Sequence, residues 1–368
     1  MKARIDSLDY LRGLFAASVM VYHFYVWSGA AADPFTHALV YKLGVYAVGA
    51  FYVISGISFA HVYRQMRLDG PSLISFYTKR FYRLAPLYWA AMAAGVVLVA
   101  AQGLATGNGL GLPGLGEVLL NASLTFGIVM PEAYMVTGGW SIGNEMAFYL
   151  LFPLILLGMR GGRAGMAIVA ALTVATCGVF AFWLMTPNQP LAAQWTTYIH
   201  PLNQVHLFVA GVAVASLPAE WRLSSRAGWG AFAALAVAFA LLPLHGDTIS
   251  IVTGWQRVAY SVVCIGLCAA AYVSPLHLPG RVHAPLAFLG QSSYSVYLLH
   301  PLVYQYTDTA LSVAGIGLPR ALLALPATLV VSSLAYRWIE APMVDAGKRR
   351  ADAWSGALRT RSAAAVAV

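Results

Sequence analysis

The stretch LDYLRGLFAASVMVYHF, residues 8–24, decides the fold class, because it sets a charge and a histidine within an apolar segment of membrane-spanning length. A transmembrane helix needs about 20 consecutive, mostly apolar residues. On such a helix Arg12 and His23, eleven positions apart, differ by about 16 Å of rise and only about 20° of rotation. Both side chains therefore project from one face, with Arg12 at the cytoplasmic edge and His23 deep in the bilayer.

The composition of the 368 residues extends this interpretation to the whole chain. Hydrophobic residues make up 60% of it and charged residues only 10%, whereas an ordinary soluble domain is about 25% charged. So few polar side chains cannot cover a water-facing surface, which excludes a soluble globular protein. We therefore predict an all-α fold, a polytopic transmembrane helix bundle formed by a single integral-membrane domain over residues 1–345. Residues 346–368 are expected to form a short, basic, disordered cytoplasmic tail.

The number of spans and their orientation follow from hydropathy and from the placement of basic residues. Lys and Arg are retained on the cytoplasmic side of a membrane. With about ten spans and both termini cytoplasmic, most of the 22 Lys and Arg residues fall on that side. A count of nine or eleven stays open. The outer loop near 104–139 becomes apolar from Leu115 to Met130, which predicts a helix packed on the bundle. The expected spans are 9–28, 43–63, 85–103, 142–159, 164–186, 202–217, 228–244, 254–274, 287–307 and 319–339.

Charge and cysteine usage exclude several classes of partner. The excess of Lys and Arg that gives the formal net charge of +9 is explained by the retention of these residues on the cytoplasmic side of the membrane. No nucleic acid partner is therefore expected. The three cysteines lie in apolar stretches without other ligands nearby, so we expect neither a disulfide framework nor a metal site. The chain also has no phosphate-binding loop or nucleophile motif in a plausible context.

The pair Arg12 and His23 allows two interpretations. A group bound through phosphate at Arg12 reaches His23 with a flexible arm of about 16 Å, which is the reach of the phosphopantetheine arm of coenzyme A. Alternatively, Arg12 only anchors the helix at the cytoplasmic interface and His23 only contacts a neighbouring helix.

A basic and aromatic element precedes the third span. It reads FYTKRFYRLAPLYW, residues 76–89, and contains Lys79, Arg80 and Arg83. The guanidinium group of arginine can donate two parallel hydrogen bonds to a phosphate, so this element is a candidate anion-binding site. The alternative is a basic flank with an aromatic belt at the membrane interface.

Two further spans carry polar groups at membrane depth. The fourth opens with GGWSIGNEMAFYLLFP, residues 138–153, in which Glu145 is placed to contact and orient His23. The ninth, LGQSSYSVYLLHPLVYQY, residues 289–306, sets Tyr297 and His300 on one face. A polar face in lipid points into the bundle, either for chemistry or for structural interhelical hydrogen bonds.

Taken together, these motifs resemble the acyltransferase-3 family of integral-membrane O-acyltransferases. The family's elements occur in order as Arg-x10-His, AVGAFYVISGISFA, Arg-x-x-Arg-x-x-Pro, Trp-Ser-x-x-x-Glu, Ser-Tyr-x-x-Tyr-Leu-x-His and the closing Glu-x-Pro of YRWIEAPM, residues 336–343. The chain departs from the pattern at Gly49, usually acidic, and at Met146, often a second Glu.

The resemblance implies a membrane-embedded O-acyltransferase of the bacterial cytoplasmic (inner) membrane. It implies transfer of an acyl group, most often acetyl, from acyl-CoA as donor substrate, with no tightly bound cofactor, to a glycan or lipid-linked sugar. The acceptor, the acyl chain and the oligomeric state stay open, as do a small natural product such as a macrolide as acceptor and a non-enzymatic transporter as function. The implied roles are catalysis by His23, Glu145, His300 and Tyr297, with Tyr297 or His300 donating to the oxyanion, and CoA binding by Arg12, Arg80, Arg83 and Lys79.

Overall fold

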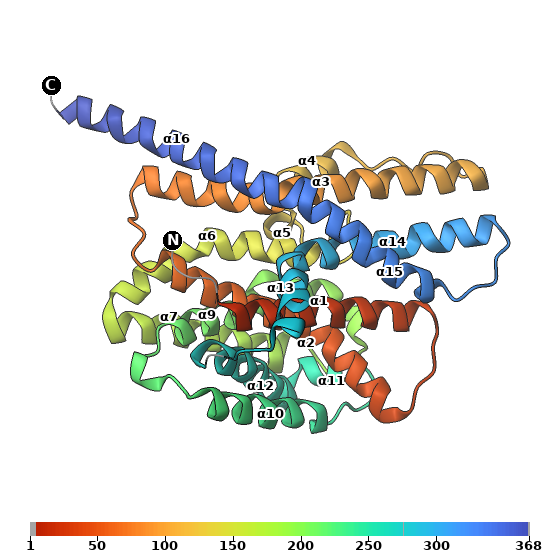
Figure 1. Ribbon diagram of the computed structural model, residues 1–368, viewed down its shortest axis with the longest axis horizontal. Helices are drawn as coiled ribbons and strands as arrows, with labels where there is room; N and C mark the ends of the chain where they lie inside the picture. Colours follow the sequence, from red (N-terminus) through yellow and green to blue (C-terminus); the bar gives the residue numbers. More distant parts are fainter. Residues whose placement is uncertain (1–4, 275, 367–368) are drawn as a thin grey trace.

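The computed structural model describes residues 5–274 and 276–366, and every regular element in this part of the chain is a helix (Figure 1). The long helices run side by side, and the start of α1 and the end of α16 lie at the same end of the bundle. The α-helices are α1 Asp6–Trp27, α2 Pro34–Tyr63, α3 Gly70–Thr106, α4 Leu115–Ala122, α5 Phe126–Val129, α6 Trp140–Arg160, α7 Gly162–Val179, α8 Trp195–Ile199, α9 Pro201–Ala215, α10 Ser225–Leu241, α11 Ile249–Val252, α12 Gly254–Val273, α13 Gly280–Gln291, α14 Ser293–Val313, α15 Arg320–Ala335 and α16 Ala341–Val366. Short π or 3-10 turns occur at Phe180–Leu184, Leu191–Gln194, Ala219–Trp221 and Tyr336–Glu340.

Six helical segments of the described chain are long and apolar enough to cross a membrane, and α9 and α10 are shorter apolar helices. Each of the ten expected spans lies mostly in helix, while the count of ten stays a prediction. One boundary was wrong, since the expected span 287–307 divides at Ser292 into α13 and α14. The six candidates are Pro34–Tyr63, Gly70–Thr106, Trp140–Arg160, Gly162–Leu184, Gly254–Val273 and Arg320–Arg359.

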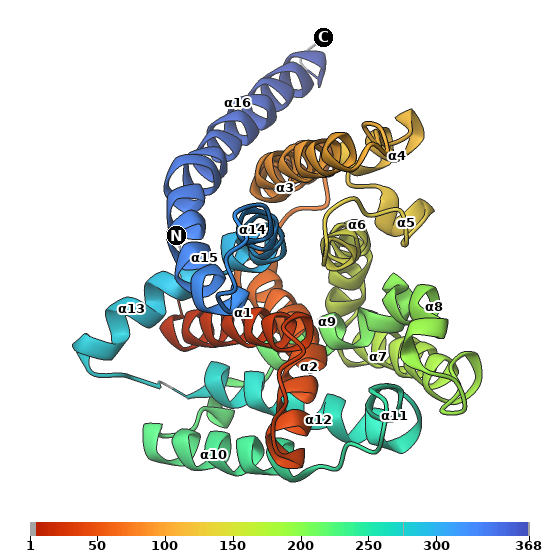
Figure 2. The same ribbon diagram turned by 90° about the vertical axis from the view of Figure 1, so that its right-hand side faces the viewer.

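The centre of the bundle depends on a close crossing of α2 and α9. A Cβ atom on Gly56 would overlap the carbonyl oxygen of Phe208, and one on Gly211 would overlap that of Val53. Helices in membranes associate through such small residues, which let their backbones approach. The end-on view of Figure 2 shows the consequence, with α1, α2 and α9 central and α3, α6 and α14 on one side of them.

The outer segment expected to form a helix on the bundle forms two, α4 and α5, separated by a turn at 123–125. Asn121 is fully buried and joins this segment to the bundle. Its amide oxygen accepts a hydrogen bond of 2.5 Å from the Tyr88 hydroxyl of α3. The outer segment therefore caps the bundle on that side.

The segment expected to form a disordered tail is helical over the described residues. Helix α16 continues to Val366 and packs along α3, as Figure 1 shows. Gly347 lies against the Tyr82 ring, and Lys79 pairs with Asp352 at 2.9 Å. Packing against a neighbouring helix stabilises a basic segment that its composition alone would leave unfolded. Residues 367–368 of the expected tail lie outside the described residues.

Candidate functional site

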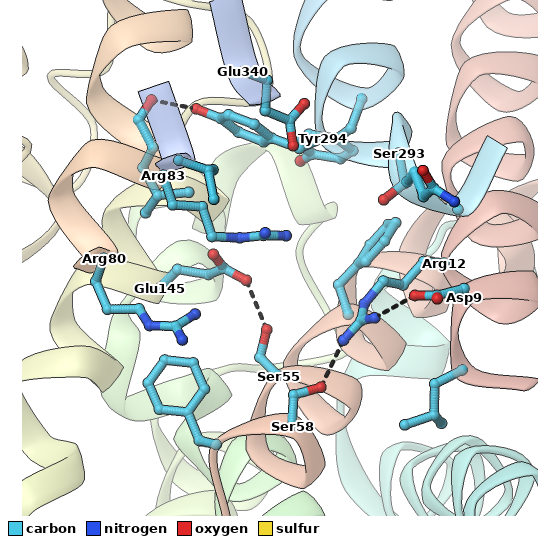
Figure 3. A pocket seen from close by; sticks show the side chains of 18 of the residues that line it. Asp9, Arg12, Ser55, Ser58, Arg80, Arg83, Glu145, Ser293, Tyr294 and Glu340 are labelled. Atoms are coloured by element: carbon cyan, nitrogen blue, oxygen red, sulfur yellow. Dashed lines mark hydrogen bonds and ion pairs between the residues drawn. The ribbon is translucent and has the colours of Figure 1, made fainter. Parts of the chain in front are cut away.

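A cavity of about 610 Å³ opens among α1, α2, α3, α6, α14 and the start of α16. Charged and hydroxyl side chains from α1, α2, α3, α6 and α14, together with Glu340 just before α16, point into it (Figure 3). Acidic and basic groups are both present, so the charges of the lining partly compensate one another. The charged lining residues are Asp9, Arg12, Arg80, Arg83, Glu145, Glu340, Asp345 and Lys348.

Asp9 and Ser58 help to hold Arg12 in this cavity. Its Nη1 lies 2.8 Å from the carboxylate of Asp9, one turn earlier on α1, and its Nη2 donates to Ser58 Oγ of α2 at 2.6 Å. The Asp9 side chain is only 2% exposed, whereas that of Arg12 is 23% exposed. A buried carboxylate thus fixes an arginine that still faces the cavity.

Arg80 and Arg83 lie one turn apart on α3 and share its cavity-facing side. The guanidinium of Arg80 stacks 4.5 Å above the Phe59 ring and donates to the Tyr63 hydroxyl at 2.8 Å. Among the described residues, its buried Nε has no hydrogen-bond partner, and no carboxylate lies within ion-pair distance of either arginine. Both side chains therefore keep N–H donors for an anion in the cavity.

The carboxylates of the two cavity glutamates, half-buried Glu145 and buried Glu340, accept hydrogen bonds from hydroxyl groups. Glu145 accepts hydrogen bonds from Ser55 at 2.8 Å and from Tyr149 at 2.7 Å, and Glu340 accepts one from Ser295 at 2.7 Å. Figure 3 shows Arg83 extending between these two carboxylates. The glutamates stabilise the half-buried arginines through charge and leave the N–H donors of these arginines free.

His23 and His300 form a hydrogen-bonded pair between α1 and α14. Nδ1 of His23 lies 2.8 Å from Nε2 of His300, and Nδ1 of His300 lies 3.1 Å from the carbonyl oxygen of Val296. A carbonyl only accepts, so in neutral His300 Nδ1 carries the proton and Nε2 accepts. His23 then donates from Nδ1, which leaves the lone pair on its Nε2. The Trp27 ring stacks on His23 at 4.8 Å and holds it in plane.

Tyr297 connects this pair to the cavity. Its ring lines the cavity, and its centroid lies 6.2 Å from that of His300, one turn later on α14. The Tyr297 hydroxyl accepts from Ser141 at 2.8 Å and donates to the carbonyl of Gly138 at 3.1 Å. The side chain of Tyr297 therefore lies between the polar cavity and the histidine pair.

The sequence matches the profile of the Acyltransferase domain family over residues 5–337, nearly the whole chain. This chain belongs to the acyltransferase-3 family. The six motifs that carry the resemblance lie in the matched region or directly after it, and they provide most of the acyltransferase's cavity lining.

Three curated proteins illustrate the relatives of this acyltransferase. The exopolysaccharide production protein ExoZ of Rhizobium meliloti (strain 1021) is 29% identical over 84% of this chain and 92% of its own. The peptidoglycan O-acetyltransferase OatA of Listeria monocytogenes is 24% identical over 92% of this chain, which spans only 56% of OatA. The acyltransferase MdmB of Streptomyces mycarofaciens is 28% identical over 82% of this chain and 80% of its own. No solved structure matches the acyltransferase.

Three expected roles do not fit the geometry of this acyltransferase. The contact between Glu145 and His23 does not form among the described residues, because Glu145 bonds to Ser55 and Tyr149 while His23 bonds to His300. His300 has no N–H left for an oxyanion, since one ring nitrogen donates to a carbonyl and the other accepts. Tyr297 already donates its hydroxyl proton to Gly138.

Lys79 lies apart from the other basic residues of its motif. It lies outside the cavity lining and forms an exposed pair with Asp352 of α16. One residue along a helix turns the side chain by about 100°, so Lys79 points away from the face that carries Arg80. Grouping these basic residues by sequence proximity alone missed this rotation.

Several cavity residues were missed. Asp9 stands three residues before Arg12, a spacing that indicates an ion pair on a helix. Glu340 belongs to the closing motif, and an acidic residue at membrane depth is itself a signal of a site. The hydroxyls of Ser55 and Ser58, and Lys348 of α16, gave no such signal, because only the tertiary packing turns them toward the cavity.

Proposed function

We propose that this acyltransferase moves an acyl group, most simply acetyl, from cytoplasmic acyl-CoA to a hydroxyl of a glycan or glycolipid in the bacterial inner membrane. The observation that carries the proposal is the cavity in which Arg80 and Arg83 retain donors without a carboxylate contact. Placing charged side chains within the membrane costs free energy, so charges retained there mark a binding site.

The donor would lie with its phosphates among Arg12, Arg80 and Arg83. Arg12 sits eleven residues before His23 on one continuous helix, α1. The corresponding rise of about 16 Å suits a phosphopantetheine arm that carries the thioester toward the histidine pair. The position of Tyr297 between cavity and pair supports this path.

His23 would act as the general base. Its Nε2 lone pair takes the proton of the acceptor hydroxyl while that oxygen attacks the thioester carbonyl. The carbon–sulfur bond then breaks, and the CoA thiolate leaves with the proton that His23 returns. His300 is a positioning residue, because its unprotonated Nε2 holds the His23 proton on Nδ1 and keeps Nε2 available.

A glycan acceptor is supported by two relatives. One is described as an exopolysaccharide production protein and one as a peptidoglycan O-acetyltransferase. Both descriptions involve polymers of sugar, whose hydroxyl groups are the atoms that an O-acyltransferase modifies.

The test is release of CoA thiol from acetyl-CoA by purified wild-type and His23→Ala protein, with membrane glycolipid extract as acceptor. We expect release by the wild type and a loss of at least about 100-fold in the variant. His206→Gln is the matched control, because His206 is buried on α9 away from the cavity lining. Undiminished release by correctly inserted His23→Ala protein would contradict the proposal. Solute counterflow without CoA would favour a transporter.

A further inference from the structure

A second cavity lies away from the site, at the end of the bundle where α6 turns into α7. It has a volume of about 700 Å³ and is lined from α6, α7, the end of α9 and the residues just after α2. These elements meet at the left-hand edge of Figure 1. None of its lining residues lines the acyl-transfer cavity. We call it the α6–α7 groove.

Three exposed arginines, Arg64, Arg160 and Arg163, line the α6–α7 groove. The guanidinium of Arg160 donates through Nη2 to the carbonyl oxygen of Met66, which holds the charged head of this side chain at the edge of the groove. Within the described residues, none of the three has a carboxylate at ion-pair distance, and no acidic side chain lines the groove. The rim therefore carries three positive charges without compensation.

The floor of the groove is apolar and continues into the membrane-spanning part of α7. Arg160 and Arg163 flank the tight turn between two candidate spans. Ala170 lies seven residues beyond Arg163, about 10 Å deeper along the helix. The remaining apolar lining residues are Leu156, Met159, Met166 and Ala167.

We propose that the α6–α7 groove binds an anionic phospholipid of the leaflet that surrounds this end of the bundle. The arginines bind the phosphate, and the apolar floor takes the first part of the acyl chains. Basic pockets between transmembrane helices at a membrane surface bind anionic headgroups in this way. Charge alone would suit any anion, but an apolar floor at acyl-chain depth matches only a lipid.

Native mass spectrometry of the full-length protein in detergent, titrated with phosphatidylglycerol or phosphatidylcholine, tests this. We expect preferential retention of phosphatidylglycerol by the wild type. The double variant Arg160→Gln, Arg163→Gln should bind it about 30-fold more weakly, with phosphatidylcholine unchanged. The matched control is Arg226→Gln, Arg281→Gln, which removes two exposed arginines from other segments. It should change phosphatidylglycerol binding by less than about twofold.

Equal binding of the two lipids by the wild type would overturn the proposal, as would equal losses in the double variant and its control. Displacement of phosphatidylglycerol by inorganic phosphate at the same concentration would show a simple anion site, which also overturns it. CoA release by the double variant should match the wild type, because neither arginine lines the acyl-transfer cavity. This readout separates a lipid effect from misfolding.

Discussion

Nδ1 of His23 lies 2.8 Å from Nε2 of His300, so one hydrogen bond joins two imidazoles on helices far apart in the sequence. His300 is 1% exposed and its other nitrogen faces the Val296 carbonyl. The direction of the shared hydrogen bond follows from that carbonyl, since only a donor can face it. His300 thereby determines which nitrogen of His23 keeps its lone pair.

Replacing His300 with Phe should lower kcat about 100-fold, because His23 loses the acceptor that fixes its tautomer. The donor KM should stay within about threefold, since His300 does not line the cavity. His300→Gln should recover part of the rate, because its amide oxygen accepts the same hydrogen bond. Steady-state kinetics with purified protein measure both parameters. Equal rates for the Phe and Gln variants would refute the positioning role.

Arg80→Ala should raise the donor KM about 10- to 100-fold, the usual contribution of a hydrogen bond to a charged group. Arg80→Lys should give an intermediate value, because Lys keeps the charge but loses the planar stacking on Phe59. Lys79→Ala is the control and should leave KM within about twofold, since Lys79 is engaged outside the cavity. A CoA-dependent thermal shift gives an independent measure. A larger effect from Lys79 than from Arg80 would contradict the assignment of the binding face.

Gly290→Ala should destabilise the protein by about 1–3 kcal/mol, because the new methyl group meets the carbonyl oxygen of Asp9. The shift of α1 should also disturb the pair between Asp9 and Arg12 and lower the transfer rate. Gly280→Ala on the same helix is the control, since its Cβ would meet no atom within 4 Å. Thermal melting in detergent compares the two. Equal melting temperatures would show that the contact between α1 and α13 is looser than described.

Amides of residues 346–359 should be protected from hydrogen exchange, because this segment is helical and its first part packs on α3. Gly347→Val should reduce the protection, since its side chain would push against Tyr82. Asp352→Asn removes only an exposed ion pair and should cost about 0–1 kcal/mol. Exchange of these amides at random-coil rates in the wild type would show instead that the segment is disordered.

The sequence by itself determined the membrane class, the all-helical fold and the family motifs. Because only 10% of the residues are charged, most of the protein surface has to face lipid. The face shared by Arg12 and His23 also follows from helical periodicity, and α1 is one continuous helix, as that interpretation requires. These inferences depend on residues of one helix, whose relative positions the backbone geometry sets.

The partners across helices were decided only by the tertiary structure. Glu145 and His300 were both plausible partners of His23, and spacing along a single helix cannot choose between them. The helix packing places α14 beside α1 and leaves Glu145 with Ser55 and Tyr149. Likewise, α16 is ordered by the surface of α3 rather than by its own composition. Contacts between helices depend on rotation and crossing, which no local pattern encodes.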